Sequence, residues 1–468
     1  MKKFLRTLYV CIMVFQGIPA QAQQPEVAWA LSFGGSGNDR ANSIATDAEG
    51  NCIVVGRYQS AELSVGTFTL TKCKDDSPDV ADLFIFKLDK NGKTLWAIGA
   101  GGKGDDHATG CTTDKQGNIY VTGWFECKDL ALGKITLHNK TEKGCDMFIA
   151  KFSPQGECQW AHNAGGDGNN GDYGTVSTDA KNHVMVSGIA GKQMDFGNGH
   201  RLTNKGKSGY AAIYSKDGEL LRVHGTTGIS EGHGCGADAK GNYYWGGIFS
   251  SPALSMYSMT LSNLSEPGEL DVFAVKYNAE GKLQWAKSLG GKGSEVATCR
   301  ADAKGNVYLG GLFFSDTLPV EKDRLINKGE GNVFMVKFST DGNTCWARSA
   351  GGGPKGTGAR NFCVDAKGNV FITGSNFADF SFGADSVKNA AGAEDVFVMK
   401  YNPDGKEMWA MGFGGQGRNA GRGITTDKKG NLFLAGSFEE KSMPVGKEAL
   451  KNAGDADIFV IKFREKSK

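Results

Sequence analysis

Hydrophobic and polar residues alternate along most of the chain in short runs typical of β-strands. Runs such as NCIVVGRY, NIYVTGWF and NLFLAGSF are rich in β-branched and aromatic residues, which favour strands. A tight-turn signal bounds each run, either D-x-x-G or a segment such as DKNG. The Asp side chain can accept hydrogen bonds from backbone amides at such turns, and Gly can adopt the positive φ that closes a hairpin. Without long helical periodicity, the pattern predicts an all-β protein.

The strand pattern repeats. D-x-x-G-N recurs at Asp47, Asp114, Asp179, Asp238, Asp302, Asp365 and Asp427, with spacings of 67, 65, 59, 64, 63 and 62 residues. The copy at Asp179, DAKNH, is degenerate. A second pattern recurs in step, as in FIFKLDKNGKTLWA and FVMKYNPDGKEMWA, but the third copy, YAAIYSKDGELLRV, has lost its Trp-Ala. The chain therefore consists of seven repeats of about 63 residues.

Each repeat divides into four strands, a to d, with a variable insert of roughly twenty residues between b and c. Four strands per repeat is the organisation of a propeller blade. The chain begins with a lone d strand, VAWALSFGG, and ends with a c strand, DADIFVIKF. This offset predicts a single seven-bladed β-propeller of twenty-eight strands over residues 23–468, in which Val27–Phe33 completes the last blade and removes an exposed edge.

These motifs closely resemble the seven-bladed β-propeller repeat of bacterial secreted proteins, called the SBBP repeat. Its pattern is D-x-x-G-N-x-Y-V-T-G-x-F, then F-G-x-x-x-L, D-x-F-V-x-K-Y and G-x-x-x-W-A-x-x-x-G-G, and the match covers almost all of the chain after residue 22. The resemblance implies the propeller fold, export and a surface or periplasmic setting. It implies no defined reaction.

The N-terminus, MKKFLRTLYVCIMVFQGIPAQAQQ, predicts a secretory signal peptide over residues 1–22. A positive start precedes a short apolar run, and Ala20-Gln21-Ala22 fits the cleavage pattern. We therefore expect a periplasmic, outer-surface or extracellular protein without a transmembrane segment. The net charge of +2 argues against a nucleic-acid partner. A monomer is expected.

Ten cysteines follow the predicted cleavage site. Cys111, Cys235 and Cys299 occupy a position that holds Ile, Val or Phe in other repeats, which indicates small buried hydrophobic side chains. Cys127 follows strand b of the second blade and Cys145 precedes its strand c. Because antiparallel neighbours bring those ends together, Cys127 and Cys145 form a possible disulfide.

The Trp-Ala-x-x-x-Gly-Gly segment recurs in most blades, so we interpret it as structural. Its glycines turn the chain from outer strand d to inner strand a of the next blade. The residues after it vary, and in a propeller they surround the mouth of the central channel. Seven positions before the turn aspartates stand Arg40, His107, Asp172, Glu231, Glu295, Gly358 and Ala420. Five positions before them stand Asn42, Thr109, Gly174, His233, Ala297, Arg360 and Arg422.

With Asp105, Asp106 and Arg418 added, this mouth is predicted to be acidic in blades two to five and basic in blades six, seven and one. Opposite charges around a pore can hold a polar ligand. The candidate ligand-binding residues are Arg40, Asp105, Asp106, His107, Asp172, Glu231, His233, Glu295, Arg360, Arg418 and Arg422. The alternative is that these charges only keep glycine-rich loops solvated.

Enzyme signatures are weak. The nucleophile motif G-x-S-x-G, the calcium loop D-x-[DN]-x-[DN]-G and paired zinc-ligand spacing are all missing from the sequence. We expect no cofactor, no metal and no catalytic residues. The favoured function is non-catalytic recognition of a glycan, peptide or protein partner at the channel mouth. A hydrolase or lyase with its site at the channel is one alternative, and a purely structural surface-assembly module is another.

Overall fold

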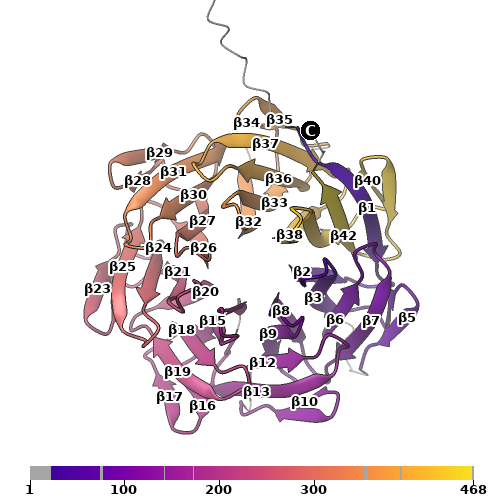
Figure 1. The fold of residues 1–468 in the computed structure, drawn as a ribbon, viewed down its shortest axis with the longest axis horizontal. Coiled ribbons are helices and arrows are strands. Elements are labelled where there is room, and N and C mark those ends of the chain that lie inside the picture. Colours follow the sequence, from indigo (N-terminus) through magenta and orange to yellow (C-terminus); the bar gives the residue numbers. More distant parts are fainter. Residues whose placement is uncertain are drawn as a thin grey trace, which may run out of the picture.

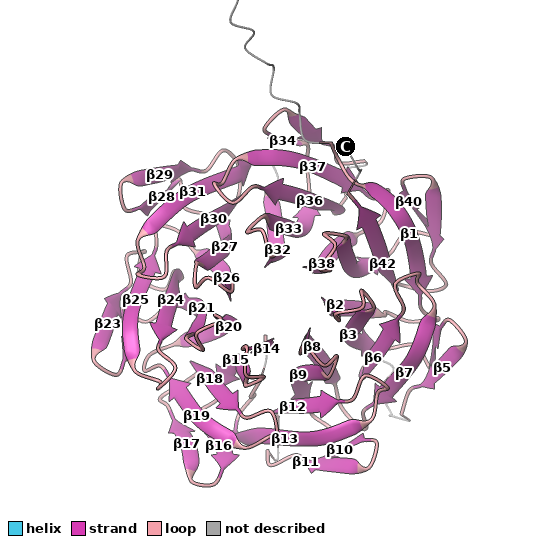
Figure 2. Cartoon of the chain, viewed as in Figure 1, coloured by secondary structure: helices cyan, strands magenta, loops and turns pink. Residues whose placement is uncertain are grey.

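The fold is a closed ring of β-sheet blades around a central channel (Figure 1). This computed structural model describes residues 23–73, 77, 79–141, 143–171, 173–352, 356–390 and 393–465. Within those residues every regular element is a strand (Figure 2). The predicted all-β, seven-bladed propeller is confirmed.

Seven four-stranded antiparallel blades form the ring, each running from inner strand a to outer strand d. The hairpin of the following blade extends the sheets of blades 2 and 5 to six strands. Blades 1 to 3 are β2–β3–β6–β7 (Arg40–Thr46, Cys52–Tyr58, Asp82–Leu88, Thr94–Ala100), β8–β9–β12–β13 (Asp106–Thr113, Ile119–Phe125, Asp146–Phe152, Cys158–Asp167) and β14–β15–β18–β19 (Thr175–Thr178, Val184–Ala190, Ser208–Tyr214, Leu220–Gly225). Blades 4 and 5 are β20–β21–β24–β25 (Ser230–Ala237, Tyr243–Phe249, Asp271–Tyr277, Leu283–Leu289) and β26–β27–β30–β31 (Glu295–Ala301, Val307–Phe313, Asn332–Phe338, Thr344–Gly351). Blades 6 and 7 are β32–β33–β36–β37 (Thr357–Val364, Val370–Asn376, Asp395–Tyr401, Glu407–Phe413) and β38–β39–β42–β1 (Asn419–Thr426, Leu432–Phe438, Asp457–Arg464, Glu26–Phe33).

The N-terminal strand closes the ring, as the sequence predicts. β1 pairs antiparallel with β42, from Glu26 opposite Arg464 to Phe33 opposite Ile458. The first and last strands of the chain thus lie side by side in one blade (Figure 1). The pairing with β1 covers the edge of β42 that would otherwise be unpaired in blade 7.

The inserts between strands b and c are hairpins, which the expected count of twenty-eight strands omits. They raise the number of strands in the described residues to 42. The hairpins are β4–β5 (Glu62–Val65, Phe68–Thr71), β10–β11 (Asp129–Leu132, Ile135–His138), β16–β17 (Gln193–Gly197, His200–Thr203), β22–β23 (Ala253–Met256, Met259–Ser262), β28–β29 (Thr317–Val320, Asp323–Ile326), β34–β35 (Phe380–Phe382, Asp385–Val387) and β40–β41 (Ser442–Val445, Glu448–Lys451). They lie on the perimeter of the ring (Figure 2).

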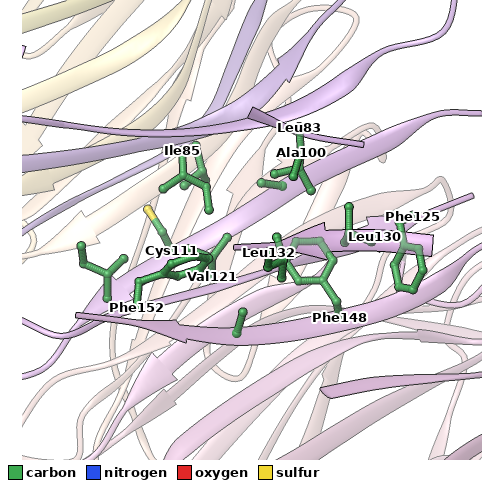
Figure 3. Close-up of a cluster of buried hydrophobic side chains, with 14 of the residues drawn as sticks. Leu83, Ile85, Ala100, Cys111, Val121, Phe125, Leu130, Leu132, Phe148 and Phe152 are labelled. Atoms are coloured by element: carbon green, nitrogen blue, oxygen red, sulfur yellow. The ribbon is translucent and has the colours of Figure 1, made fainter. Parts of the chain in front are cut away.

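The core lies between neighbouring blades. Figure 3 shows one such cluster, in which Leu83 and Ile85 of blade 1 face Val121, Phe125 and Phe148 of blade 2. Face-to-face burial of adjacent sheets is why each strand b and c is apolar on both faces. A single blade has no core of its own, so the stability of each repeat depends on its neighbours.

The D-x-x-G-N motif builds the turn between strands a and b. In blade 1, Asp47 Oδ1 accepts hydrogen bonds from the backbone amides of Glu49 and Asn51, both at 3.0 Å. Asn51 Nδ2 donates to Asp47 Oδ2 at 2.8 Å. Gly50 has a φ of 84°, which few residues with a side chain adopt. The motif is therefore a self-contained turn, and its aspartate is occupied by structure.

The recurrent Trp and Lys lock each blade to the next. Trp96 Nε1 and Lys87 Nζ of blade 1 both donate to the carbonyl oxygen of Pro154 in blade 2, at 3.1 and 3.3 Å. The Trp96 ring also covers Gly156, where a Cβ would lie only 3.0 Å away. The same pair of hydrogen bonds, from a Trp and a Lys of one blade to one carbonyl oxygen of the next, is here called the interblade lock. It joins five of the seven blade pairs. This explains why W-A and F-x-x-K recur in step.

Candidate functional site

The channel mouth is shaped by β-bulges in the inner strands. The register of strand a against strand b shifts at Asn42, Thr109, His233, Arg360 and Arg422. These are residues five positions before the turn aspartate. A bulge leaves one residue without a ladder partner and re-aims its side chain. The repeat therefore presents one freely variable side chain per bulged blade.

A cavity of about 540 Å³ lies along these strands. All seven residues at the position five before the turn aspartate line it, from Asn42 of blade 1 to Arg422 of blade 7. His107 and Glu231, both from the position seven before, line it as well. Five of the predicted ligand-binding residues therefore share one cavity: His107, Glu231, His233, Arg360 and Arg422.

One wall of the cavity is cationic. Arg360 Nη2 lies 2.7 Å from Glu394 Oε1, which partly neutralises it. Among the residues that the structure describes, Arg422 forms no ion pair and its Nε has no hydrogen-bond partner. Burial and the nearby charges of Arg360 and Arg40 lower the pKa of Arg422 to about 9. Because this value is above neutral, the Arg422 guanidinium remains charged at pH ~7.

The opposite wall is aromatic and carries two histidines. The rings of His107 and Trp124 lie 4.1 Å apart, centroid to centroid. Tyr173, at a positive φ of 55°, places its ring 4.9 Å from that of His233. His233 Nε2 in turn lies 2.9 Å from Glu231 Oε2. The cavity thus combines guanidinium groups on one side with flat ring faces on the other.

The structure contradicts the predicted placement of Asp106 and Glu295 at the mouth. Both are fully buried at the start of strand a. Asp106 accepts hydrogen bonds from the amides of Gly102, Glu126 and Cys127 at 2.9, 3.1 and 3.2 Å. Glu295 likewise accepts from the Gly291 amide at 3.1 Å. These carboxylates hold the Gly-Gly turn. Burial raises the pKa of each to about 7.

The remaining candidates lie outside the cavity lining. Arg40 Nε donates to Asn38 Oδ1 at 2.6 Å, and its Nη2 is 3.9 Å from Glu439. Asp105 accepts from the Ala81 amide at 2.9 Å and lies 3.5 Å from His107 Nε2, so it orients that ring. Arg418 is exposed. Asp172 lies outside the described residues. The predicted acidic side is therefore reduced, among described residues, to Glu231 on the cavity wall.

Sequence reasoning missed Trp124, Tyr173 and Arg300, which also line the cavity. Trp124 follows the glycine of strand b, at a position that holds Arg57, Ile248 or Ser375 in other blades. The variability of the position after the strand b glycine could have indicated a site residue, because side chains at that position lie beside the channel mouth. Arg300 precedes a turn aspartate by two and donates to Asn361 Oδ1 at 3.1 Å. Only the folded propeller shows that the Arg300 side chain reaches the channel.

The possible Cys127–Cys145 disulfide is not formed in this structure, where both residues are free thiols. Cys145 Sγ contacts the Asn170 carbonyl oxygen at 3.4 Å, and Cys127 packs in the core between blades 1 and 2. Cys111, Cys235 and Cys299 are buried, as the repeat predicts.

The described residues show neither a metal-binding cluster nor a membrane-spanning helix. They contain no group of three or more His, Cys, Asp or Glu side chains placed to hold a metal ion. None of these residues form a helix long and apolar enough to cross a membrane.

No protein-family model matches the sequence. Among curated proteins, the chain is 20% identical over 517 aligned residues to an uncharacterized WD repeat-containing protein of Acanthamoeba polyphaga mimivirus, covering 88% of this chain and 36% of the relative. It is 25% identical over 192 residues to the regulatory protein FlaEY of Caulobacter vibrioides, covering 40% of this chain and 20% of that protein. The chain thus spans about a third or less of these relatives.

Solved structures with a similar chain path include a protein of unknown function from Dyadobacter fermentans. Its TM-score is 0.37 at 8% identity, covering 94% of this chain and 98% of that one. Another is the endosialidase of phage phi92, with a TM-score of 0.40 at 8% identity, covering 94% and 69%.

Proposed function

We propose that this protein is an exported, non-catalytic binding propeller that recognises an anionic group of a glycan, peptide or protein partner at the channel mouth. The resemblance to SBBP repeats supports the export. The charged side chains of the cavity wall support an anionic ligand. Its single most informative feature is Arg422, a charged side chain in the cavity wall whose Nε lacks a hydrogen-bond partner among the described residues.

A guanidinium nitrogen buried without a hydrogen-bond partner, as Arg422 Nε is among the described residues, is unfavourable because it has lost water without gaining an acceptor. The charge of Arg360 beside it adds repulsion, as the lowered pKa of Arg422 reflects. A carboxylate, sulfate or phosphate bound between Arg360 and Arg422 would relieve both effects. Arginine is well suited to this because its planar donors match such groups in pairs.

The opposite wall suits a ligand with a flat, partly apolar face. Trp124 and Tyr173 present rings to the cavity, and aromatic faces stack on sugar rings or on peptide side chains. Together the walls fit an elongated ligand with its charge at the arginines. The variable bulge residues would then set which ligand each relative of this fold accepts.

The experiment is a binding screen of acidic and neutral oligosaccharides and peptides on protein that lacks residues 1–22. Binding should weaken by about 100-fold or more in Arg360→Ala/Arg422→Ala, since each charged hydrogen-bond donor is worth about 1.5–3 kcal/mol. Arg324→Ala, on the exposed edge of β29, is the matched control and should leave binding unchanged. Equal affinity of the wild type and the double variant would refute the proposal.

A hydrolase or lyase is the second candidate because Glu231 and His233 form a 2.9 Å pair on the same cavity. The His233 hydrogen bond lowers the pKa of Glu231, although burial opposes it. A general acid in glycoside hydrolysis needs a raised pKa instead, so the pair favours orientation of a ligand over acid catalysis. Chain cleavage of a bound acidic oligosaccharide that disappears in His233→Ala would favour the enzyme.

A further inference from the structure

The interblade lock is broken between blades 3 and 4. The Lys position of blade 3 holds Ile213, and its Trp position holds Arg222. The carbonyl that would accept both donors belongs to Ala279, two residues before the turn glycine Gly281. Arg222 lies over this glycine, since a Cβ there would be 2.7 Å from Arg222 Cδ. Among the described residues, however, no side chain donates to the Ala279 carbonyl oxygen.

Two further departures from the repeat meet at the same place. Asn182–His183 replaces the Gly–Asn of the blade 3 turn, and Tyr243 replaces the aliphatic residue or cysteine found at its position in every other blade. These residues are about sixty positions apart in the chain. In the structure His183 and Tyr243 line one pocket of about 280 Å³, together with Arg222 and Ala279. Independent drift at three repeat positions, those of His183, Arg222 and Tyr243, gives no reason for the changes to converge on one pocket.

The polar atoms of the pocket are held in defined orientations. Asp179 Oδ2 lies 2.9 Å from His183 Nδ1, while Asp179 Oδ1 accepts from the amides of Lys181 and His183, both at 2.8 Å. The carboxylate is therefore occupied by the turn. With Nδ1 donating to Asp179, the other ring nitrogen of His183 is left as an acceptor or, when protonated, a donor. The Tyr243 hydroxyl lies 3.4 Å from His183 Nδ1.

The pocket offers a ligand two different kinds of contact, one for an anion and one for a hydrogen-bond donor. Arg222 and Lys181 supply positive charge beside a carboxylate that is already engaged, which favours an anion. The Ala279 carbonyl needs a hydrogen-bond donor, which an anion alone does not supply. A volume of about 280 Å³ is slightly below the usual range for drug-sized ligands, roughly 300–1,000 Å³.

We propose that the gap left by the broken lock is a second binding site, separate from the channel, for a small carboxylate that also carries a hydroxyl or ammonium donor. The carboxylate binds Arg222, and the donor takes the place of the missing Trp and Lys on the Ala279 carbonyl. A sugar acid and an amino acid both satisfy this chemistry.

The test is calorimetric titration of the protein lacking residues 1–22 with D-galacturonate, L-serine, glucose and inorganic phosphate. We expect saturable binding of galacturonate or serine, which distinguishes the two sources, and none of glucose. Arg222→Ala should weaken this binding by about tenfold or more, since it removes a charged hydrogen bond. Arg201→Ala, an exposed arginine on the outer hairpin of the same blade, is the matched control.

Ile213→Lys/Arg222→Trp provides a second readout. It rebuilds the interblade lock, so it should raise the unfolding temperature and abolish binding. Failure of both galacturonate and serine to bind, phosphate binding as tight as theirs, or full binding by the rebuilt variant would overturn the proposal. The channel variant Arg360→Ala/Arg422→Ala should bind these probes normally, so the two sites can fail independently.

Discussion

Asp106→Asn should stabilise the protein at high pH and lose that advantage in acid. Asp106 is fully buried, and burial outweighs its three backbone donors, raising its pKa from 3.8 to about 7. Because the folded pKa lies above the unfolded one, the wild type loses stability as the pH rises from about 4 to about 7. At 1.36 kcal/mol per pKa unit, a shift of about three units corresponds to about 4 kcal/mol.

The repeat itself shows that asparagine fits at this position. Blade 3 has Asn170 there, whose Oδ1 accepts from the Gly191 amide at 2.9 Å and whose Nδ2 donates to the Gly168 carbonyl at 2.8 Å. In Asp106→Asn the Gly102 amide would lose its acceptor, at about 1 kcal/mol. The variant should therefore be more stable than the wild type by about 3 kcal/mol above pH ~7.5.

The assay is chemical unfolding of both proteins at about pH 4.5 and about pH 8. The stability difference should grow by about 3 kcal/mol between these two conditions. Asp105→Asn is the neighbouring control with the opposite sign. Although burial opposes it, the His107 contact lowers the pKa of Asp105, so that variant should be less stable than the wild type near neutral pH. A stability difference for Asp106→Asn that is the same at both pH values would contradict this prediction.

Four other outcomes are expected. Trp346→Ala should cost about 3–5 kcal/mol in unfolding free energy, because Trp346 is buried and locks blade 5 to the Pro403 carbonyl; a smaller loss than in exposed Leu95→Ala would contradict this. A permutant with the Glu26–Phe33 strand moved behind Arg464 should fold, since Glu26 and Arg464 are paired, whereas simple deletion of that strand should leave insoluble protein. Mass spectrometry without reduction should find Cys127 and Cys145 as alkylatable thiols after unfolding, and a linked peptide would contradict the structure. N-terminal sequencing of protein exported by a bacterial host should begin at Gln23, and an intact Met1 in the exported fraction would count against the signal peptide.

The sequence predicts the architecture well because the repeat is local and periodic. Each D-x-x-G-N turn forms within five residues, and the alternation between turns sets strand direction and face. The offset between VAWALSFGG and DADIFVIKF was enough to predict ring closure. The hairpins between strands b and c were missed because their strands are only three to five residues long and lie within the variable insert.

The candidate site was predicted only in part. The position five before the turn aspartate lines the channel in all seven blades, so counting from the repeat worked there. Two positions earlier the same counting failed for Glu295, which is buried. The pairing of strand a with strand b runs without a register shift from Glu295 to Ala301 in blade 5, whereas blades 1, 2, 4, 6 and 7 have a β-bulge there. The sequence does not show which blades have the bulge, so the same count reaches a buried position in blade 5.

The number of blades, their order and the closing strand can be predicted from the sequence, because they follow from short-range turns and strand periodicity. The folded ring is needed to show which charged side chains are accessible and which departures from the repeat lie next to each other. Arg360 and Arg422 are neighbours because consecutive blades place their bulges side by side. His183, Arg222, Tyr243 and Ala279 share a pocket because a junction is built from two repeats. Which side chains of different repeats come into contact depends on their positions in the folded ring. The periodicity along the chain does not give these positions.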